Sequence, residues 1–440
     1  MYSNKEIWNV SYPIFLSLLA QNIINVTDTA FLGRLGEVEL GASAMGGLYY
    51  ICLFTVAFGF STGSQIVIAR RNGEKQYASI GPVMIQGVFF LFAAALLVLG
   101  FSLLCGRGVM GILISSDAVL EASLDFLNIR VFGFIFSFAN VMFRALYVGI
   151  ARTKVLTFNA VLMALTNVVL DYLLIFGHGG FPAMGIQGAA IASVIAEAVS
   201  IGFFLVYTRL TVDIKKYGLN KFRSFDFTLL KRVLNISIYT MMQHFVSMST
   251  FFLFFIAVER IGQRELAVAN IVRSIYIIMF IPVNSLSAAV NTFVSNAMGA
   301  KRVDQVMPTI RKIAKISLLI MSVCALVVCL MPRLIVSIYT NNPDLINESV
   351  PAVYVISAAM LICSVSNVYF NGVSGTGNTR PAFAMEIVVL ILYCIHISVF
   401  AILLKMPVYI CFTSEIVYYG GLLILCMIYL KKAAWYKKRI

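Results

Sequence analysis

The sequence contains little charge for its length. Of its 440 residues, 12% are Asp, Glu, Lys or Arg and 60% are hydrophobic, and the chain has only 3 histidines and 2 tryptophans. Such a composition cannot cover a water-exposed surface. Apolar runs of about 20 residues, the length that crosses a hydrocarbon core, recur along almost the whole chain. These features exclude an ordinary soluble domain and predict a polytopic membrane protein.

Several functional patterns are also missing. Runs such as LFAAALLVLGFSLL (91–104) lack the alternation of a membrane barrel, so we expect the spans to be helices. The 8 cysteines show no paired metal-ligand spacing. The chain has no phosphate-binding glycine loop, no HExxH and no Ser or Cys nucleophile beside a His at a membrane face. We therefore expect a carrier and not an enzyme, with no cofactor and with no energy source of its own beyond an ion gradient.

The predicted fold is all-α, with twelve transmembrane helices. Lys and Arg gather in alternate loops, which places those loops and both termini on the cytoplasmic side. The net charge of +14 therefore reflects membrane topology and not a nucleic-acid partner. The expected spans lie near 10–33, 45–68, 82–105, 125–150, 155–177, 187–209, 233–258, 266–293, 313–337, 349–374, 381–404 and 407–430.

The longest polar connection divides these spans into six and six. We predict an N-lobe at 1–210, a cytoplasmic linker at 211–232, a C-lobe at 233–430 and a basic cytoplasmic tail at 431–440. The two halves carry matching turns at one offset, RLGEVEL (34–40) with RIGQREL (260–266) and GIARTK (149–154) with GTGNTR (375–380). Gly36 and Gly262, for example, differ by 262 − 36 = 226 positions. Because each copy has an even number of spans, we expect two six-helix bundles related by a pseudo-two-fold axis along the membrane normal, with a binding cleft between them.

Acidic side chains within the spans predict a coupling-ion site. An ionised group near the bilayer centre costs about 2.5–3.5 kcal/mol, so it needs a partner, water or a proton. Counting about 1.5 Å per residue puts Asp28, Asp171 and Ser193 at one depth. Asn167 and Glu197 each lie four residues from one of these, on the same helix face. We predict that these five residues bind the coupling ion, with Na⁺ at Asp28, Asn167 and Asp171 or a proton in its place. Hydrogen bonding between packed helices is the alternative.

The offset of 226 residues indicates that this site belongs to one lobe. At this offset Asp28 corresponds to Phe254 and Asp171 corresponds to Ile397, so the C-lobe has a hydrocarbon side chain at both positions. A packing requirement common to both copies does not explain this difference. An asymmetric ion site does.

Other positions in the spans carry weaker signals. Gln243 and His244 are either substrate contacts in the cleft or a packing pair. Pro13 and Pro282 are either hinges or static kinks, because proline removes a backbone hydrogen bond. Two acids lie outside the predicted site. Glu386 is expected to pair with Arg380 and Glu415 has no evident partner.

The sequence resembles the MATE family, the multidrug and toxic compound extrusion transporters. The resemblance rests on Pro13, NVTDTAFLGRLG (25–36), GIARTK (149–154), TNVVLDYLLIFG (166–177), GIQGAAIAS (185–193) and GTGNTRP (375–381). It implies that Asp28, Asn167 and Asp171 bind Na⁺ or H⁺, that Ser193 replaces a frequent Thr, and that the helix bends at Pro13 on protonation. Members of the NorM type carry acids in spans seven and ten, which this chain lacks, so the pattern is closer to DinF-like members.

The resemblance implies secondary active efflux of amphipathic organic cations in exchange for Na⁺ or H⁺ by alternating access. The expected setting is the cytoplasmic (inner) membrane of a prokaryote, and the expected partners are small-molecule substrates and the lipid bilayer around a monomer. The main alternative is a flippase for lipid-linked oligosaccharides or lipids from the same superfamily. A membrane enzyme and a channel are more distant alternatives. The residues alone indicate a two-lobed, ion-coupled carrier.

Overall fold

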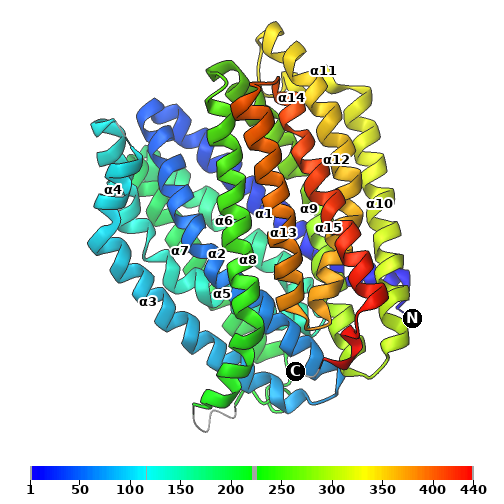
Figure 1. Ribbon diagram of the computed structural model, residues 1–440. Coiled ribbons are helices and arrows are strands. Elements are labelled where there is room, and N and C mark those ends of the chain that lie inside the picture. Colours follow the sequence, from blue (N-terminus) through cyan, green and yellow to red (C-terminus); the bar gives the residue numbers. More distant parts are fainter. Residues whose placement is uncertain (1, 115, 221–224, 439–440) are drawn as a thin grey trace. The chain divides into compact units, whose positions relative to one another are not determined.

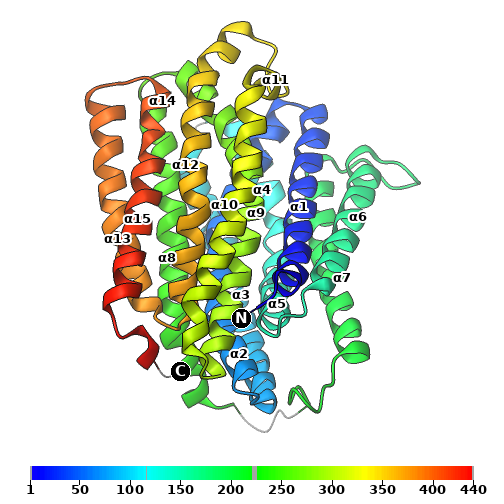
Figure 2. The ribbon, with the colours of Figure 1, turned by 90° about the vertical axis from the view of Figure 1, so that its right-hand side faces the viewer.

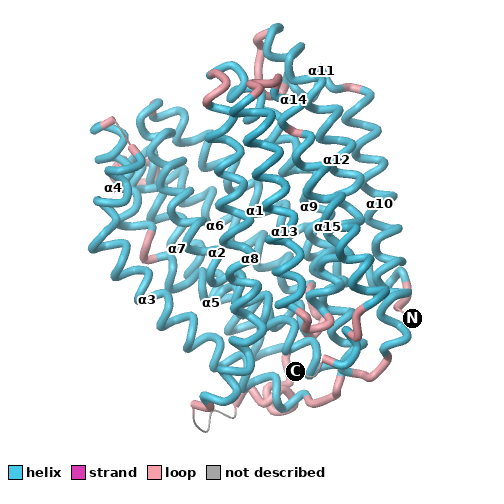
Figure 3. The backbone as a smooth tube through the Cα atoms, viewed as in Figure 1, coloured by secondary structure: helices cyan, strands magenta, loops and turns pink. Residues whose placement is uncertain are grey.

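The computed structural model describes residues 2–114, 116–220 and 225–438. Within these ranges every regular element is a helix, and loops are confined to the helix ends (Figure 3). Helices satisfy their backbone polar groups internally, as a hydrocarbon environment requires. The predicted all-α fold is confirmed.

Eleven helices in the described ranges are long and apolar enough to cross a membrane, or up to 12 spans if one bent pair counts as a single span. The long helices are α1 (Asn4–Leu35), α2 (Glu37–Gly73), α3 (Ile80–Leu113), α6 (Lys154–Phe176), α7 (Gly185–Thr211), α8 (Phe227–Glu259), α9 (Gln263–Gly299), α10 (Val306–Leu330), α12 (Pro343–Gly375), α13 (Thr379–Ile397) and α15 (Thr413–Lys432). Shorter elements are η1 (Tyr77–Ser79), η2 (Val303–Gln305), α11 (Pro332–Ser337), η3 (Ser398–Leu403), α14 (Val408–Cys411) and η4 (Trp435–Lys437).

The fourth span differs from the prediction of one continuous helix at 125–150. It consists of α4 (Asp117–Arg130) and α5 (Gly133–Gly149), which are bent by 55° at the break between them. Glycine at the start of α5 allows close packing at this bend: a Cβ on Gly133 would lie 2.2 Å from Nη1 of Arg130 and 2.4 Å from Oε2 of Glu197. The break therefore brings the end of α4 against a charged side chain of α7.

The helices form two compact units, called here the N-unit, Tyr12–Met241, and the C-unit, which comprises the residues up to Ser11 and those from Met242 onward. The unit boundaries fall within α1 and α8, which are coloured dark blue and green in Figures 1 and 2: the first turns of α1 belong to the C-unit and those of α8 to the N-unit. Lys312 of α10 donates to the backbone oxygen of Tyr2 at 2.7 Å. Thr240 of α8 donates to the backbone oxygen of Gly59 at 2.7 Å. Each half thus contributes its first helical turns to the unit formed by the other half.

The internal repeat appears in the backbone of each unit. Helices α2 and α9 begin and end at positions 226 residues apart, and so do η1 and η2. Lys75 and Lys301, at the same offset, both adopt left-handed backbone angles, with φ of 59° and 58°. Few residues other than glycine adopt this conformation, so its recurrence at equivalent lysines indicates that the turn is a shared structural feature.

A shared helix contact occurs at the first residue of the GIARTK motif and at its counterpart in GTGNTR. A Cβ on Gly149 would lie 3.2 Å from the backbone oxygen of Gln65. A Cβ on Gly375 would lie 2.6 Å from the backbone oxygen of Asn291. Both glycines and both carbonyls are separated by the same 226 positions, so α5 approaches α2 as α12 approaches α9. Small residues permit this close helix packing.

Candidate functional site

The acids predicted to bind a coupling ion meet inside the N-unit. Asp28 lies on α1, and Asn167 and Asp171 lie one turn apart on α6. The carboxyl groups of Asp28 and Asp171 are within hydrogen-bonding reach of each other. Asp171 is completely buried, Asn167 is 1% exposed and Asp28 is half-buried. The structure therefore brings together the three residues for which the sequence predicted a common ion site.

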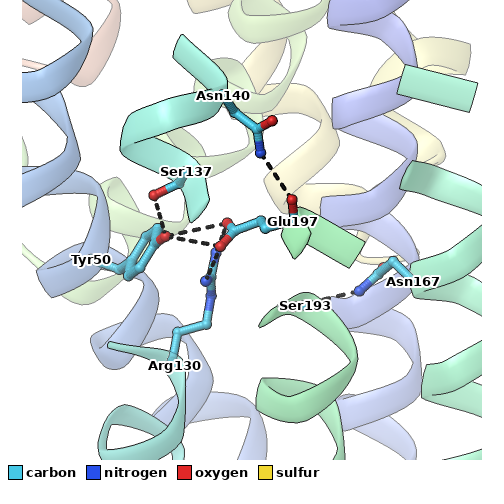
Figure 4. Close-up of polar contacts among 7 residues, drawn as sticks. All are labelled: Tyr50, Arg130, Ser137, Asn140, Asn167, Ser193 and Glu197. Atoms are coloured by element: carbon cyan, nitrogen blue, oxygen red, sulfur yellow. Dashed lines mark hydrogen bonds and ion pairs between the residues drawn. The ribbon is translucent and has the colours of Figure 1, made fainter. Parts of the chain in front are cut away.

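The amide of Asn167 lies between the two acids and α7. The orientation that satisfies its hydrogen bonds directs the nitrogen at the acids, and it donates to Oδ1 of Asp28 at 2.9 Å and to Oδ2 of Asp171 at 3.2 Å. The other end of the amide then faces Ser193 Oγ at 3.5 Å (Figure 4). The amide thus satisfies one oxygen of each carboxylate by hydrogen bonding.

Close packing of α6 on α7 holds Asn167 opposite Ser193. The two helices lie side by side (Figure 2). A Cβ on Gly188 of α7 would lie 2.8 Å from the backbone oxygen of Leu174 on α6, so this contact depends on glycine. Ser193 follows Gly188 on α7 and faces Asn167 one helix away (Figure 4). Its hydroxyl thus lies 3.5 Å from the amide.

One atom of the acid cluster has no hydrogen-bond partner. Oδ1 of Asp171 is buried, and no donor in the described part of the chain contacts it. A buried acceptor without a partner is costly, and an ionised one more so. An acidic cluster with an orphaned carboxylate atom fits a proton or a hard monovalent cation.

Glu197 has a different environment from the one the sequence suggested. It lies one turn beyond Ser193 on α7, and both its oxygens contact Arg130, Oε1 to Nη2 at 2.7 Å and Oε2 to Nη1 at 3.0 Å. Tyr50 Oη lies 3.2 Å from each oxygen, and the guanidinium lies 3.7 Å from the centre of the Tyr50 ring (Figure 4). This bidentate pair neutralises Glu197 within the unit. No described hydrogen bond joins Glu197 to the Asp28 and Asp171 cluster.

Sequence reasoning did not assign Arg130 or Tyr50 to this site. The side chains of Arg130 and Glu197 are both 13% exposed. The charge of Arg130 also acts on Asp28, so the ion pair borders the acid cluster. The signal available in the sequence was Arg130 itself, one of few cations expected within a span. The sequence did not indicate Glu197 as the partner of Arg130, because the direction of the Arg130 side chain depends on the break between α4 and α5.

The remaining candidates lie elsewhere. Gln243 and His244 are half-buried residues of α8 and belong to the C-unit, whereas Asp28 and Asp171 belong to the N-unit. Pro13 and Pro282 lie inside the continuous helices α1 and α9. The backbone oxygen of Pro13 accepts a hydrogen bond from Thr157 of α6 at 3.1 Å. The roles of these four residues in substrate contact and hinge motion stay predictions.

Comparison with known protein families identifies the chain. The family model MatE matches residues 13–173 and again 240–402. This chain belongs to the MATE family. The two matched segments begin 227 positions apart, 240 − 13, which agrees with the internal repeat. Membership confirms the predicted family, and with it the expectation of a transporter and not an enzyme.

Curated relatives support the same MATE assignment. A probable multidrug resistance protein NorM of Thermotoga maritima is 23% identical over 86% of this chain and 81% of its own length. A protein of the same name from Agrobacterium fabrum is 28% identical over 65% of this chain and 62% of its own length.

Solved structures share the fold of this MATE chain. A eukaryotic MATE transporter, AtDTX14, has a TM-score of 0.86 at 16% identity and covers 98% of this chain and 96% of its own. An outward-facing multidrug resistance MATE transporter of the MOP superfamily has a TM-score of 0.87 at 15% identity, with 99% and 97% coverage. These likenesses confirm a multi-pass helical membrane protein with the two-bundle MATE architecture.

Proposed function

We propose that this protein is a multidrug exporter that moves amphipathic organic cations out of the cell in exchange for H⁺ or Na⁺. The observation that carries the proposal is the buried pair of Asp28 and Asp171, in which Oδ1 of Asp171 lacks a hydrogen-bond partner. The names of the curated relatives, probable multidrug resistance proteins, support the substrate class. No cofactor beyond the coupling ion is needed.

The acid pair is suited to bind an ion reversibly. Two adjacent carboxylates repel each other when both are ionised, so a proton or cation between them lowers the free energy of the site. The amide nitrogen of Asn167 donates to both carboxylates, which stabilises them when no ion is bound. A half turn of this amide would direct its oxygen at a cation held between the acids, so the same side chain can serve both states without a large rearrangement.

Coupling follows from the effect of the ion on α1 and α6. Asp28 and Asp171 belong to different helices, and the ion between them links these helices. In the proposed cycle, ion binding from outside and substrate binding from inside stabilise opposite forms of an alternating-access carrier. Arg130 is paired with Glu197 through both terminal nitrogens, and we assign ion binding to the acid pair. The roles proposed for Pro13 as a hinge in α1, and for Gln243 and His244 as substrate contacts, belong to the same cycle.

The proposed setting is the cytoplasmic membrane of a prokaryote, with both termini and the basic loops on the cytoplasmic side and the protein acting as a monomer. Large exposed hydrophobic side chains support lipid contact along the outer helices. Leu97 and Leu104 on α3 are 76% and 86% exposed, and Leu319 on α10 is 68% exposed. Such side chains are stable in hydrocarbon and unfavourable in water.

A transport assay tests the proposal. The purified protein is reconstituted in liposomes, and efflux of a fluorescent organic cation is followed under an imposed proton gradient and then under an imposed Na⁺ gradient. We expect one gradient to drive efflux, and Asp171→Asn to reduce it to the rate of protein-free liposomes. Asp344→Asn is the matched control, because Asp344 is 73% exposed and makes only a long contact with Arg264.

The lipid flippase is the alternative outcome of this assay. If neither gradient drives efflux, or if Asp171→Asn leaves efflux intact, the exporter proposal is wrong. A flippase for an anionic lipid pyrophosphate would need free cations within the spans. Arg130 is engaged by Glu197 through both terminal nitrogens, and Arg144 and Arg273 lie over the rings of Phe58 and Phe255. The spans thus offer few cations to an anionic lipid, which makes this alternative the weaker one.

A further inference from the structure

The C-unit contains a second group of buried acids, formed by Glu386 on α13 and Glu415 on α15. Glu386 is 2% exposed, and Glu415 is partly buried. The expected ion pair of Glu386 with Arg380 is not formed. Oε1 of Glu386 instead accepts from the hydroxyls of Ser247 on α8 and, at 3.1 Å, Tyr418 on α15. Both of its donors are neutral.

Glu415 is held in the same way. Its Oε1 accepts from the hydroxyl of Tyr393 at 3.0 Å. The helices α13 and α15 therefore exchange contacts reciprocally: α13 contributes Glu386 and Tyr393, and α15 contributes Tyr418 and Glu415. The rings of Tyr393 and Tyr418 pack edge to face with centroids 6.0 Å apart, which links the two glutamates through the tyrosines.

Tyrosines and cysteines make up the titratable groups that are found around both glutamates. The titratable groups that act on or contact the pair come from α9, α12, α13 and α15, and they are Tyr276, Cys363, Tyr393, Tyr418, Tyr419 and Cys426. His396 on α13 hydrogen-bonds to Thr413. Among the described residues no Lys or Arg pairs with either glutamate, whereas Glu197 in the N-unit has both oxygens on Arg130.

The geometry favours a proton over a larger ion. Both donors to Glu386 converge on Oε1, while Oε2 is buried and has no hydrogen-bond partner in the described chain. This is the arrangement of a neutral carboxylic acid, in which Oε1 is the carbonyl oxygen and the proton resides on Oε2. A bound Na⁺ would need several oxygens that turn lone pairs toward it, whereas the hydroxyls here donate to the carboxyl group. An ionised glutamate in this place would be a buried charge without compensation.

We propose that Glu386 and Glu415 form a proton-binding site in the C-unit, separate from the Asp28 and Asp171 site of the N-unit. These glutamates lie in α13 and α15, the last two long helices of the described chain. Movement of α13 against α15 would break the hydrogen bonds from Tyr393 and Tyr418 to both acids at once and would change the proton affinity of these acids. The site does not depend on which ion the N-unit carries.

Infrared spectroscopy of the purified full-length protein tests the site directly. Protonated carboxyl groups absorb at the carbonyl stretch, and exposed carboxyl groups are ionised at about pH 7. We expect the wild-type protein to retain this absorption at that pH, and Glu386→Gln and Glu415→Gln each to remove part of it. Glu348→Gln is the matched control, because Glu348 is 48% exposed and pairs with Arg264, and it should leave the band unchanged.

Any of three results would overturn the proposal. An unchanged band in both glutamine variants would mean that these acids are ionised. Loss of the Glu386 contribution on addition of Na⁺, but not of choline, would make the site a sodium site. If a glutamine variant does not fold, Tyr418→Phe replaces it: loss of a donor to Oε1 should shift the band, and an absent shift contradicts the proposal. Because no gradient or substrate is used, these outcomes are independent of the efflux assay.

Discussion

The two units stabilise their buried acids by different means, although they derive from one repeat. In the N-unit, Glu197 is neutralised by Arg130, and Asp28 lies against Asp171. In the C-unit, Glu386 accepts hydrogen bonds only from hydroxyl groups among the described residues. The repeat thus preserved the helices and their turns while the charged positions diverged.

Equivalent positions show how far this divergence extends. At the offset of 226 residues, Asp28 corresponds to Phe254, which is 2% exposed, and Asp171 corresponds to Ile397, which is 5% exposed. In the opposite direction, Glu386 corresponds to Ala160, which is 3% exposed. Each unit therefore has acids where the other has hydrocarbon. A common packing need would conserve such positions, so the difference indicates separate functions.

The largest expected effect is the loss of gradient-driven efflux when either acid of the N-unit pair is replaced, and it tests whether the two acids form one site. We expect Asp28→Asn, Asp171→Asn and the double variant all to reduce gradient-driven efflux to the liposome background, because both carboxylates hold the same ion. Residues that act as a unit give non-additive losses. Initial efflux rates measure this. A double variant that loses clearly more than either single variant would make these acids independent sites.

The next effect concerns the ion pair that distinguishes Glu197 from the C-unit glutamates. Glu197→Gln leaves Arg130 buried without a counter-charge, and we expect it to lower the free energy of unfolding by about 3–5 kcal/mol. Arg130→Gln with Glu197→Gln removes both charges and should restore much of the loss. Denaturant titration in detergent micelles measures the difference.

The matched control for that prediction is Glu121→Gln. Glu121 contacts Arg107 at 2.6 Å, but these side chains are 61% and 74% exposed. Solvent screening limits such a surface pair to about 1 kcal/mol or less. If Glu197→Gln and Glu121→Gln lower the free energy of unfolding equally, the buried ion pair contributes no more to stability than the exposed one, and the prediction is wrong.

The sequence was sufficient to predict the helical spans and the meeting of Asp28, Asn167 and Asp171. Both follow from one-dimensional quantities: the length of apolar runs, and the depth reached by counting residues along a helix. The same counting places Glu197 on the helix face of Ser193, but it does not identify Arg130 as the partner of Glu197. Arg130 reaches Glu197 because the chain bends by 55° between α4 and α5, and no proline in the sequence marks that bend.

The acids of the C-unit show a second limit of sequence reasoning. Helical periodicity identifies which residues share a face but not which helix lies opposite. Glu386 was therefore assigned to Arg380, six positions away in the sequence, whereas its observed partners Ser247 and Tyr418 lie 139 and 32 positions away. The chain has 20 tyrosines, so the sequence does not indicate that Tyr393 and Tyr418 are the ones that lie beside the glutamates. The packing of α13 on α15 shows this.

A moderate effect is expected where α6 packs on α7. Gly188→Ala would place a Cβ 2.8 Å from backbone atoms of Leu174, which cannot move aside without shifting α6. Overpacking of this kind costs about 1–3 kcal/mol, and here it would also separate Asn167 from Ser193 and reduce efflux. Gly202→Ala on the same helix is the control, because no atom lies within 4 Å of its added Cβ. Similar unfolding free energies and efflux rates for the two variants would contradict the close contact.

The smallest effect compares hydroxyl groups beside the acids of each unit. Ser193 contacts the Asn167 amide at the long distance of 3.5 Å, so we expect Ser193→Ala to weaken the apparent affinity for the coupling ion by about 1 kcal/mol, or roughly fivefold, and Ser193→Thr to preserve it. The ion concentration that gives half-maximal efflux measures this. Ser247→Ala removes a donor to Glu386 and should change the carboxyl infrared band of the C-unit instead. If Ser193→Ala abolishes efflux, the hydroxyl is an essential ligand, and the acid pair alone does not define the site.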